Sequence, residues 1–301
     1  MSDDAAPSIF ERVLALKKLT PFAELPPEDL APLAACMVPR AVPAGAALPG
    51  GGEDGGSAHV LLEGRVREDG RSREAPALLG MRDVLAETAP AARVAEVESR
   101  TLEIARPALL AVLADEFEVW LATLRHVCAQ APRPGSAAVG AGGPVGAAAQ
   151  PGSETLADRI TSLRRCAPFA GLGIHPLGEI ASEANEVAFE PGRVLWRRGD
   201  AAAHLLAIES GALRCTEGTG PPRDAGPGAL PGLTESLCAR RFDYRAEARG
   251  AVRALRIDVE ALLDVLEDAP EAGVEMLCVI ARGPRLADPA STPGGVRHDD
   301  E

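Results

Sequence analysis

The chain contains two copies of one sequence pattern, and this repeat constrains its fold more than any other feature. At a constant offset of 147 positions, turn and core residues of the first copy coincide with identical residues of the second. Farther along the offset becomes 153, so the second copy carries a net insertion of six residues. Agreement at one offset over such a length is not expected by chance and indicates a duplication. The coinciding pairs include Pro21/Pro168, Leu30/Leu177, Gly45/Gly192, Gly64/Gly211, Ala95/Ala248 and Ile104/Ile257.

The length and the low-complexity segments set the expected domain boundaries. A chain of 301 residues is long enough for two domains of roughly 100–200 residues each. Residues 129–154 are almost entirely Ala, Gly, Pro, Ser and Val, a composition that cannot bury enough surface to order itself. The sequence therefore predicts a first domain at 8–128, a flexible linker at 129–154, a second domain at 155–282 and a disordered tail at 283–301.

Each copy is predicted to run from a helix through short strands to further helices. In the first copy, residues 26–29 open a helix, and an apolar face follows from Leu30 to Met37 at 3.6-residue spacing. Alternating apolar segments bounded by glycine and proline predict short strands. Helical spacing returns at about 107–128 and 259–282. The expected fold class is α+β, with two β-barrels of the jelly-roll type in tandem, each flanked by N- and C-terminal helices.

The charge balance and the hydropathy exclude several classes of partner. Asp and Glu number 44 against 31 Lys and Arg, which gives a net charge of −13. An acidic chain of this kind repels phosphate backbones, so no nucleic-acid partner is expected. No run of about 18 apolar residues is present, so no membrane span is expected either. The acidic start of the chain lacks the order of a secretory signal, and the predicted location is the cytoplasm.

The sequence carries no motif for catalysis or metal binding. None of the six cysteines forms a CxxC pair, so reduced and mostly buried thiols are expected, without a metal or redox site. The five histidines are scattered rather than clustered as in a cupin metal site. Neither a G-x-S-x-G elbow nor a P-loop is present, and the acidic, glycine-rich segment 50–56 is interpreted as a mobile hairpin loop. The protein is therefore predicted to be neither an enzyme nor dependent on a cofactor or a metal.

Two motifs and the order of the expected elements resemble the cyclic-nucleotide-binding domain family, seen in cAMP receptor proteins, kinase regulatory subunits and gated channels. Residues 19–25, LTPFAEL, are similar to the family's L-x-x-x-P-F-x-x-L segment, and residues 189–200, FEPGRVLWRRGD, are similar to its glycine turn. The resemblance covers about 17–125 and 163–282 and implies cAMP or cGMP as the ligand. In that family, a Gly-Glu pair at the start of a short helix binds phosphate and ribose, and an Arg some ten residues later pairs with the phosphate.

In the first copy, the residues that match this ligand site are Gly80 and Arg93. Met81 stands where the family has its Glu, and a thioether cannot replace that carboxylate toward a ribose hydroxyl. If Ala95 fixes the final strands, the family Arg would fall near Ala89, and Arg93 lies about four residues later, inside a strand. Two interpretations remain open: Arg93 contacts a phosphate, or it is a strand residue that faces solvent.

In the second copy, the matching residue is Gly232, with Glu235 close behind it. The position of the family Arg falls near Phe242, beside Arg240 and Arg241. Either one of these arginines completes an anion site, or the two form a basic loop segment balanced by nearby carboxylates. The predicted ligand-binding residues of both copies are Gly80, Arg93, Gly232, Glu235, Arg240 and Arg241.

These observations predict a non-catalytic regulatory protein of signal transduction, in which binding to a barrel shifts the flanking C-terminal helices. Neither copy has every residue of the family's ligand site, so cyclic-nucleotide binding is predicted to be weakened. The alternative is an interaction scaffold whose barrels bind only a protein partner. The apolar face of Ile9, Val13 and Leu16 either docks such a partner or packs on its own barrel. A transcription factor is not expected, because neither a recognition helix nor a basic face follows the second copy.

Overall fold

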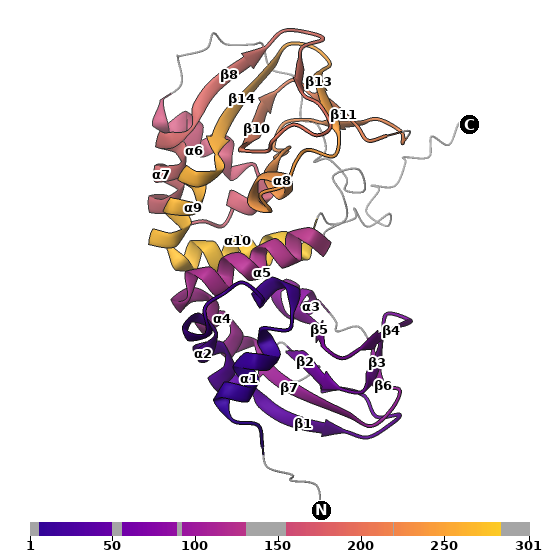
Figure 1. Ribbon diagram of the computed structural model, residues 1–301. Coiled ribbons are helices and arrows are strands. Elements are labelled where there is room, and N and C mark those ends of the chain that lie inside the picture. Colours follow the sequence, from indigo (N-terminus) through magenta and orange to yellow (C-terminus); the bar gives the residue numbers. More distant parts are fainter. Residues whose placement is uncertain (1–5, 50–55, 89–91, 131–154, 219, 284–301) are drawn as a thin grey trace, which may run out of the picture.

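The protein is described here by a computed structural model, which places residues 6–49, 56–88, 92–130, 155–218 and 220–283 (Figure 1). The structure is a mixed arrangement of helices and antiparallel sheets, as the sequence predicts. The predicted linker and tail lie almost wholly outside the described residues, as does most of the predicted hairpin loop at 50–56.

The first half of the chain places two helices before its strands and two after them. Its strands form two antiparallel sheets, in the orders β1-β7-β2-β5 and β4-β3-β6. The helices are α1 (Ile9–Leu16), α2 (Pro27–Cys36), α3 (Met81–Ala86), α4 (Arg106–Asp115) and α5 (Phe117–Gln130), with a short 3-10 turn at Thr20–Phe22. The strands are β1 (Val38–Val42), β2 (Ser57–Glu63), β3 (Arg65–Glu68), β4 (Arg71–Glu74), β5 (Ala77–Leu79), β6 (Arg93–Ala95) and β7 (Ser99–Ala105).

The second half follows the same order of elements. Its sheets have the orders β10-β14-β8 and β12-β11-β13-β9. The helices are α6 (Leu156–Arg164), α7 (Ile174–Glu183), α8 (Leu233–Leu237), α9 (Val259–Asp268) and α10 (Pro270–Arg282), with a 3-10 turn at Ala167–Phe169. The strands are β8 (Asn185–Phe189), β9 (Val194–Trp196), β10 (His204–Ser210), β11 (Leu213–Thr216), β12 (Arg223–Ala225), β13 (Arg245–Ala248) and β14 (Val252–Asp258).

Elements of the two halves begin and end at the spacings seen in the sequence. Helix α2 starts at Pro27 and α7 at Ile174, which are 147 positions apart. Strand β7 starts at Ser99 and β14 at Val252, which are 153 positions apart. The neighbours β1-β7-β2 of one sheet recur as β8-β14-β10. The same sequence pattern therefore takes up the same local structure twice.

The segments predicted as C-terminal helices each consist of two helices. In the second half the break falls at Ala269, whose backbone leaves the helical conformation at φ −127° and ψ 70°. The following residue is Pro270, and proline disfavours the helical conformation in the residue before it. In the first half the break falls at Glu116, whose backbone is extended, and α5 continues to Gln130, two residues past the predicted boundary.

The last helices of the two halves, α5 and α10, lie against each other between the two groups of strands (Figure 1). Trp120 of α5 is buried against Gly273 of α10, where a Cβ atom would lie 3.3 Å from the indole. One continuous apolar cluster includes side chains from both halves. Each short helix also contacts the last helix of the other half, because α3 packs on α10 and α8 packs on α5.

The N-terminal helix α1 starts in a capping box, in which Ser8 and Glu11 satisfy each other's backbone N–H groups. Val13 and Leu16 are buried against the first half, as expected for a helix that packs on its own strands. Ile9, predicted to share that face, is 51% exposed. Packing therefore accounts for two of the three residues of the predicted face.

The described residues hold neither a membrane-spanning helix nor a metal-like cluster. No helix there combines the length and the apolar character that crossing a membrane requires. Among the same residues, His, Cys, Asp and Glu side chains do not gather in groups of three that could hold a metal ion.

Candidate anion-binding sites

The first candidate site is built around the glycine that precedes α3. Gly80 has φ of +73°, a left-handed conformation that residues with a Cβ rarely adopt. A Cβ atom at this position would lie 2.7 Å from Cζ of Arg93. The guanidinium of Arg93 therefore lies directly over Gly80. The structure brings together the two residues that the sequence singled out in the first copy.

Arg93 faces inward, which overturns the interpretation that it is a solvent-facing strand residue. In β6, Arg93 and Ala95 are buried and Val94 between them is exposed. The side chain of Arg93 is only 3% exposed. Alternate residues of a strand share a face, so the buried Ala95 places Arg93 on the interior face as well.

The buried guanidinium is already paired with carboxylates of the same half. Glu68 Oε1 accepts a hydrogen bond from Arg93 Nε at 2.8 Å and another from the backbone N–H of Gly80 at 3.1 Å. Glu68 and Arg93 lie directly opposite each other in the β3–β6 register. Asp83 of α3 forms a second ion pair with Arg93. Gly80 and Arg93 thus hold a carboxylate of the chain itself.

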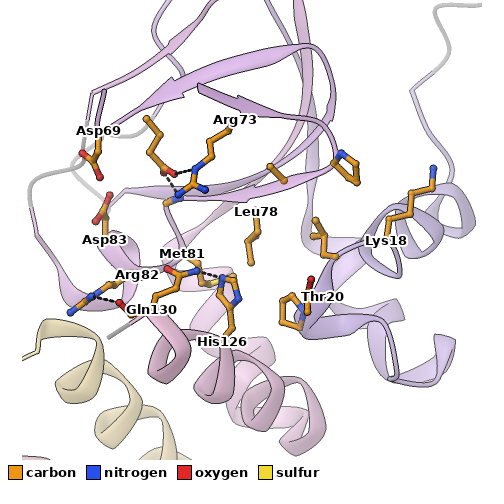
Figure 2. A pocket seen from close by; sticks show the side chains of 16 residues that line it. Lys18, Thr20, Asp69, Arg73, Leu78, Met81, Arg82, Asp83, His126 and Gln130 are labelled. Atoms are coloured by element: carbon orange, nitrogen blue, oxygen red, sulfur yellow. Dashed lines mark hydrogen bonds and ion pairs between the residues drawn. The ribbon is translucent and has the colours of Figure 1, made fainter. Parts of the chain in front are cut away.

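A cavity of about 400 Å³ opens beside this cluster (Figure 2). Arg73 lies on one side of it and His126 of α5 on the other. Burial lowers the pKa of His126, so this imidazole is neutral at pH 7. Three cationic and three anionic side chains line the cavity, so it carries no net positive charge for an anion: Lys18, Arg73 and Arg82 against Glu68, Asp69 and Asp83.

The equivalent glycine of the second half has the same backbone conformation with different neighbours. Gly232 precedes α8 with φ of +93°, and its N–H donates to the hydroxyl of Tyr244 at 3.1 Å. A Cβ atom here would lie 2.9 Å from the carbonyl oxygen of His204 in β10 and 3.5 Å from the ring of Phe242. That ring stacks on Trp196 with centroids 4.3 Å apart, and Tyr244 meets both rings edge-on. The backbone of β10 and buried aromatic rings therefore surround Gly232, in place of a guanidinium.

The strand register shows where the two halves diverge. The first half pairs Glu68 with Arg93 across β3 and β6. At the corresponding position of the second half, Cys215 pairs with Ala246 across β11 and β13. Two small side chains replace an ion pair at this position, and the aromatic rings occupy the same end of the strands.

Of the other predicted residues of the second half, the two arginines are exposed, and Glu235 lies in the first turn of α8. Arg240 and Arg241 are exposed, and Arg241 Nη1 donates to the carbonyl of Gly199 at 2.7 Å. Their exposure is what the basic-loop interpretation expects. Glu235 is buried, and its Oε2 has no hydrogen-bond partner. Burial, as the largest cause, raises the pKa of this carboxyl group above its usual 4.5.

Sequence reasoning missed the side chains that accept hydrogen bonds from the two glycine amides, and the second carboxylate that pairs with Arg93. Glu68 lies two positions after the buried Val66 in β3, and this alternation was a usable signal that it faces the interior. Asp83 and Tyr244 had no such signal. Their roles follow from the positions of α3 and β13 relative to the glycines, which only the folded structure fixes.

Comparison with known proteins finds a family model that is similar to part of the second half. Residues 186–269 match the family model described as "Cyclic nucleotide-binding domain". No curated protein sequence matches the chain.

Three solved structures are similar to the chain at low TM-scores. The cAMP-bound regulatory domain of Toxoplasma gondii PKA is 16% identical, with 89% of this chain and 96% of that chain covered and a TM-score of 0.36. The regulatory subunit of a cAMP-independent protein kinase A from Trypanosoma brucei, as a mutant bound to cAMP in the A site, is 15% identical, with coverages of 90% and 92% and a TM-score of 0.33. The N-terminal domain of a transcriptional regulator from Streptomyces coelicolor A3(2) is 25% identical, with coverages of 40% and 90% and a TM-score of 0.37.

Proposed function

We propose that this chain is a non-catalytic regulatory scaffold, built from two cyclic-nucleotide-binding-like domains whose ligand sites are filled by their own side chains. The domains would span residues 8–128 and 155–282. The family match at 186–269 supports this assignment for the second half. The recurrence of the same elements and strand order supports it for the first half. The partner of such a scaffold is a protein.

One observation carries the proposal: the amide of each site glycine already donates to a side chain of its own half. Gly80 N–H donates to Glu68, and Gly232 N–H donates to Tyr244. A cyclic phosphate would have to displace an ion-paired carboxylate in the first half and a buried aromatic group in the second. In the first half, its negative charge would also face Glu68 and Asp83.

Contacts between the short helix of one half and the last helix of the other would let a movement in one half reach the other. Arg82 of α3 donates to the carbonyl of Ala281 in α10 at 2.9 Å. Glu87, just after α3, pairs with Arg106 of its own half and with Arg282 of α10. A protein partner that moves α3 or α8 would therefore act directly on the last helix of the other half.

A second candidate function is a cyclic-nucleotide sensor in the first half, favoured by the position of Arg93 over Gly80. In that case a phosphate would take the place of the Glu68 carboxylate on both groups. The sensor and the scaffold differ in whether nucleotide stabilises the fold.

Thermal unfolding of the full chain with and without millimolar cAMP, cGMP or a cyclic dinucleotide separates the two functions. A scaffold shows no shift, whereas a ligand at 100 times its Kd stabilises by about 2.7 kcal/mol. The variant Glu68→Gln then tests whether the Glu68 carboxylate closes the first site. Glu74→Gln, at an exposed position on the neighbouring strand, is its control.

Nucleotide-dependent stabilisation that appears in Glu68→Gln alone supports a site closed by its own carboxylate. Stabilisation of the unchanged protein that disappears in Arg93→Lys would make the first half a sensor and end the scaffold proposal. No stabilisation in any variant leaves a scaffold whose site was lost for reasons beyond Glu68.

A further inference from the structure

Two cysteines from different halves of the chain meet where α5 packs against α8. Cys128 lies in the last turn of α5, and Cys238 caps the C-terminal end of α8. They are far apart in sequence, and residues 129–154 of the predicted linker lie between them. Their proximity is therefore a product of the packing of the two halves, and spacing in the sequence did not reveal it.

Hydrogen bonds fix the end of α8 on one face of α5. Cys238 Sγ donates to the carbonyl of Arg125 at 3.6 Å, and Arg125 Nε reaches the carbonyl of Leu237 at 3.5 Å. Residues three apart on a helix share a face, so Arg125 and Cys128 both face α8. Cys128 lies one turn after Arg125 on this face, next to Cys238, and the two thiols shift each other's pKa.

The two thiols differ in reactivity. The hydrogen bond from Cys128 lowers the pKa of Cys238, whereas the same bond, together with burial, raises the pKa of Cys128. The thiolate is the nucleophilic form of cysteine. Cys238 is also partly exposed, whereas Cys128 is buried. Cys238 is thus the thiol that a small oxidant reaches first, and Cys128 is positioned behind it.

We propose that Cys128 and Cys238 form a reversible disulfide when a peroxide oxidises the protein, and that this bond locks α8 of the second half onto α5 of the first. The proposal is independent of what the two glycine sites bind.

The chemistry proceeds in two balanced steps. The Cys238 thiolate attacks one oxygen of hydrogen peroxide, the O–O bond breaks, and the products are a sulfenic acid and hydroxide. The sulfur of Cys128 then attacks Sγ of Cys238, the S–S bond forms, and the sulfenic oxygen leaves as water with the proton of Cys128. Two thiols are oxidised by two electrons, and one peroxide is reduced to two waters. A dithiol reverses the bond by thiol–disulfide exchange.

The disulfide would act on the contact that joins the halves. Helix α8 follows Gly232, so a bond at its other end fixes the short helix of the second site. Oxidation is therefore expected to slow backbone hydrogen exchange in α8 and in the last turn of α5, and to raise the Tm of the full chain by several degrees.

The test treats the reduced full chain with hydrogen peroxide, blocks the remaining thiols by alkylation, and maps disulfides by mass spectrometry. The expected product is a peptide pair joined through Cys128 and Cys238, two hydrogens lighter than the separate peptides and split by dithiothreitol. Cys36→Ser, which removes an exposed thiol elsewhere, is the control and should leave the yield unchanged.

The variant Cys128→Ala should leave Cys238 as a sulfenic or more oxidised monothiol product, and it should lose the rise in Tm. Cys238→Ser, at the more exposed position, should leave Cys128 unoxidised under the same treatment. Oxidation of Cys36 with both Cys128 and Cys238 still reduced would overturn the proposal. So would over-oxidation of Cys238 in the unchanged protein without any joined peptide.

Discussion

The two halves place a glycine of the same conformation at the start of a short helix, yet they surround it with opposite chemistry. Over Gly80 lies the guanidinium of Arg93, held by carboxylates. Beside Gly232 lie the backbone of β10 and the ring of Phe242, which packs against other aromatic groups. The aromatic residues that lie in described strands, Phe189 and Trp196, both belong to the second half. The comparison teaches that one backbone frame keeps its shape whether its interior is ionic or apolar, provided that each glycine amide finds an acceptor.

This difference is expected to appear in how each half responds to the loss of its central group. An apolar interior loses burial and packing when a ring is removed. An ionic interior loses little if both charges go together and much if one is left alone. Single and paired substitutions are therefore expected to change the free energy of unfolding differently in the two halves.

The largest effect is expected in the aromatic half. Phe242→Ala removes a ring that is 1% exposed and leaves a cavity over Gly232, so the free energy of unfolding should fall by about 4 kcal/mol. Urea unfolding measures this change. Phe242→Leu, which keeps most of the volume, is the matched control and should cost less than half as much. Equal losses in the two variants would mean that the stacking geometry, and not burial, holds this half together.

The next effect belongs to the ionic half. Arg93→Leu leaves Glu68 and Asp83 without their shared cation and should cost about 3 kcal/mol in urea unfolding. The double variant Glu68→Leu with Arg93→Leu removes the facing pair from β3 and β6 and should recover much of this loss. Losses that simply add in the double variant would show that the two side chains act independently, against the paired geometry.

A smaller effect tests the acceptor of the second glycine. Tyr244→Phe keeps the ring and removes the hydroxyl that accepts from Gly232 N–H, so an amide is left unpaired in the interior. The expected cost is about 1.5 kcal/mol in the free energy of unfolding. Faster hydrogen exchange of the Gly232 amide, measured by NMR, would locate the effect. An unchanged exchange rate would contradict the assigned hydrogen bond.

The smallest effect is a pH dependence of opposite sign in the two halves. Burial lowers the pKa of His59 below its usual 6.5, so the stability it contributes is present above pH 6.5 and is lost as the pH falls below that value. Burial raises the pKa of Glu235 above 4.5, so its contribution is present below pH 4.5 and is lost as the pH rises through the raised pKa. Acidification therefore weakens the first half and strengthens the second.

Unfolding of the unchanged protein, His59→Gln and Glu235→Gln at pH 7.5 and pH 4.5 measures these two contributions. The change in stability on acidification should become less negative in His59→Gln, because the histidine that must stay neutral is gone. It should become more negative in Glu235→Gln, because the gain from protonating a buried carboxylate is gone. Changes of the same sign in both variants would contradict the comparison.

The sequence alone determined much of the order and position of the helices and strands. Identical residues at offsets of 147 and 153 fixed where helices and strands recur, because apolar spacing and turn residues act locally. The sequence also singled out Gly80, Arg93 and Gly232 as candidates, through the motifs around them. Alternation along β6 was enough to place Arg93 beside Ala95 in the interior, although the motif comparison did not use it.

Only the tertiary structure decided what fills the two sites and what joins the two halves. Glu68 meets Arg93 because β3 pairs with β6, and Tyr244, just before β13, meets Gly232, just before α8; neither contact lies within a single helix or strand. The thiols of Cys128 and Cys238 meet for the same reason. Local spacing determines which face of an element is apolar, but the partner of a buried polar group depends on how elements pack, and that arrangement is a property of the whole fold.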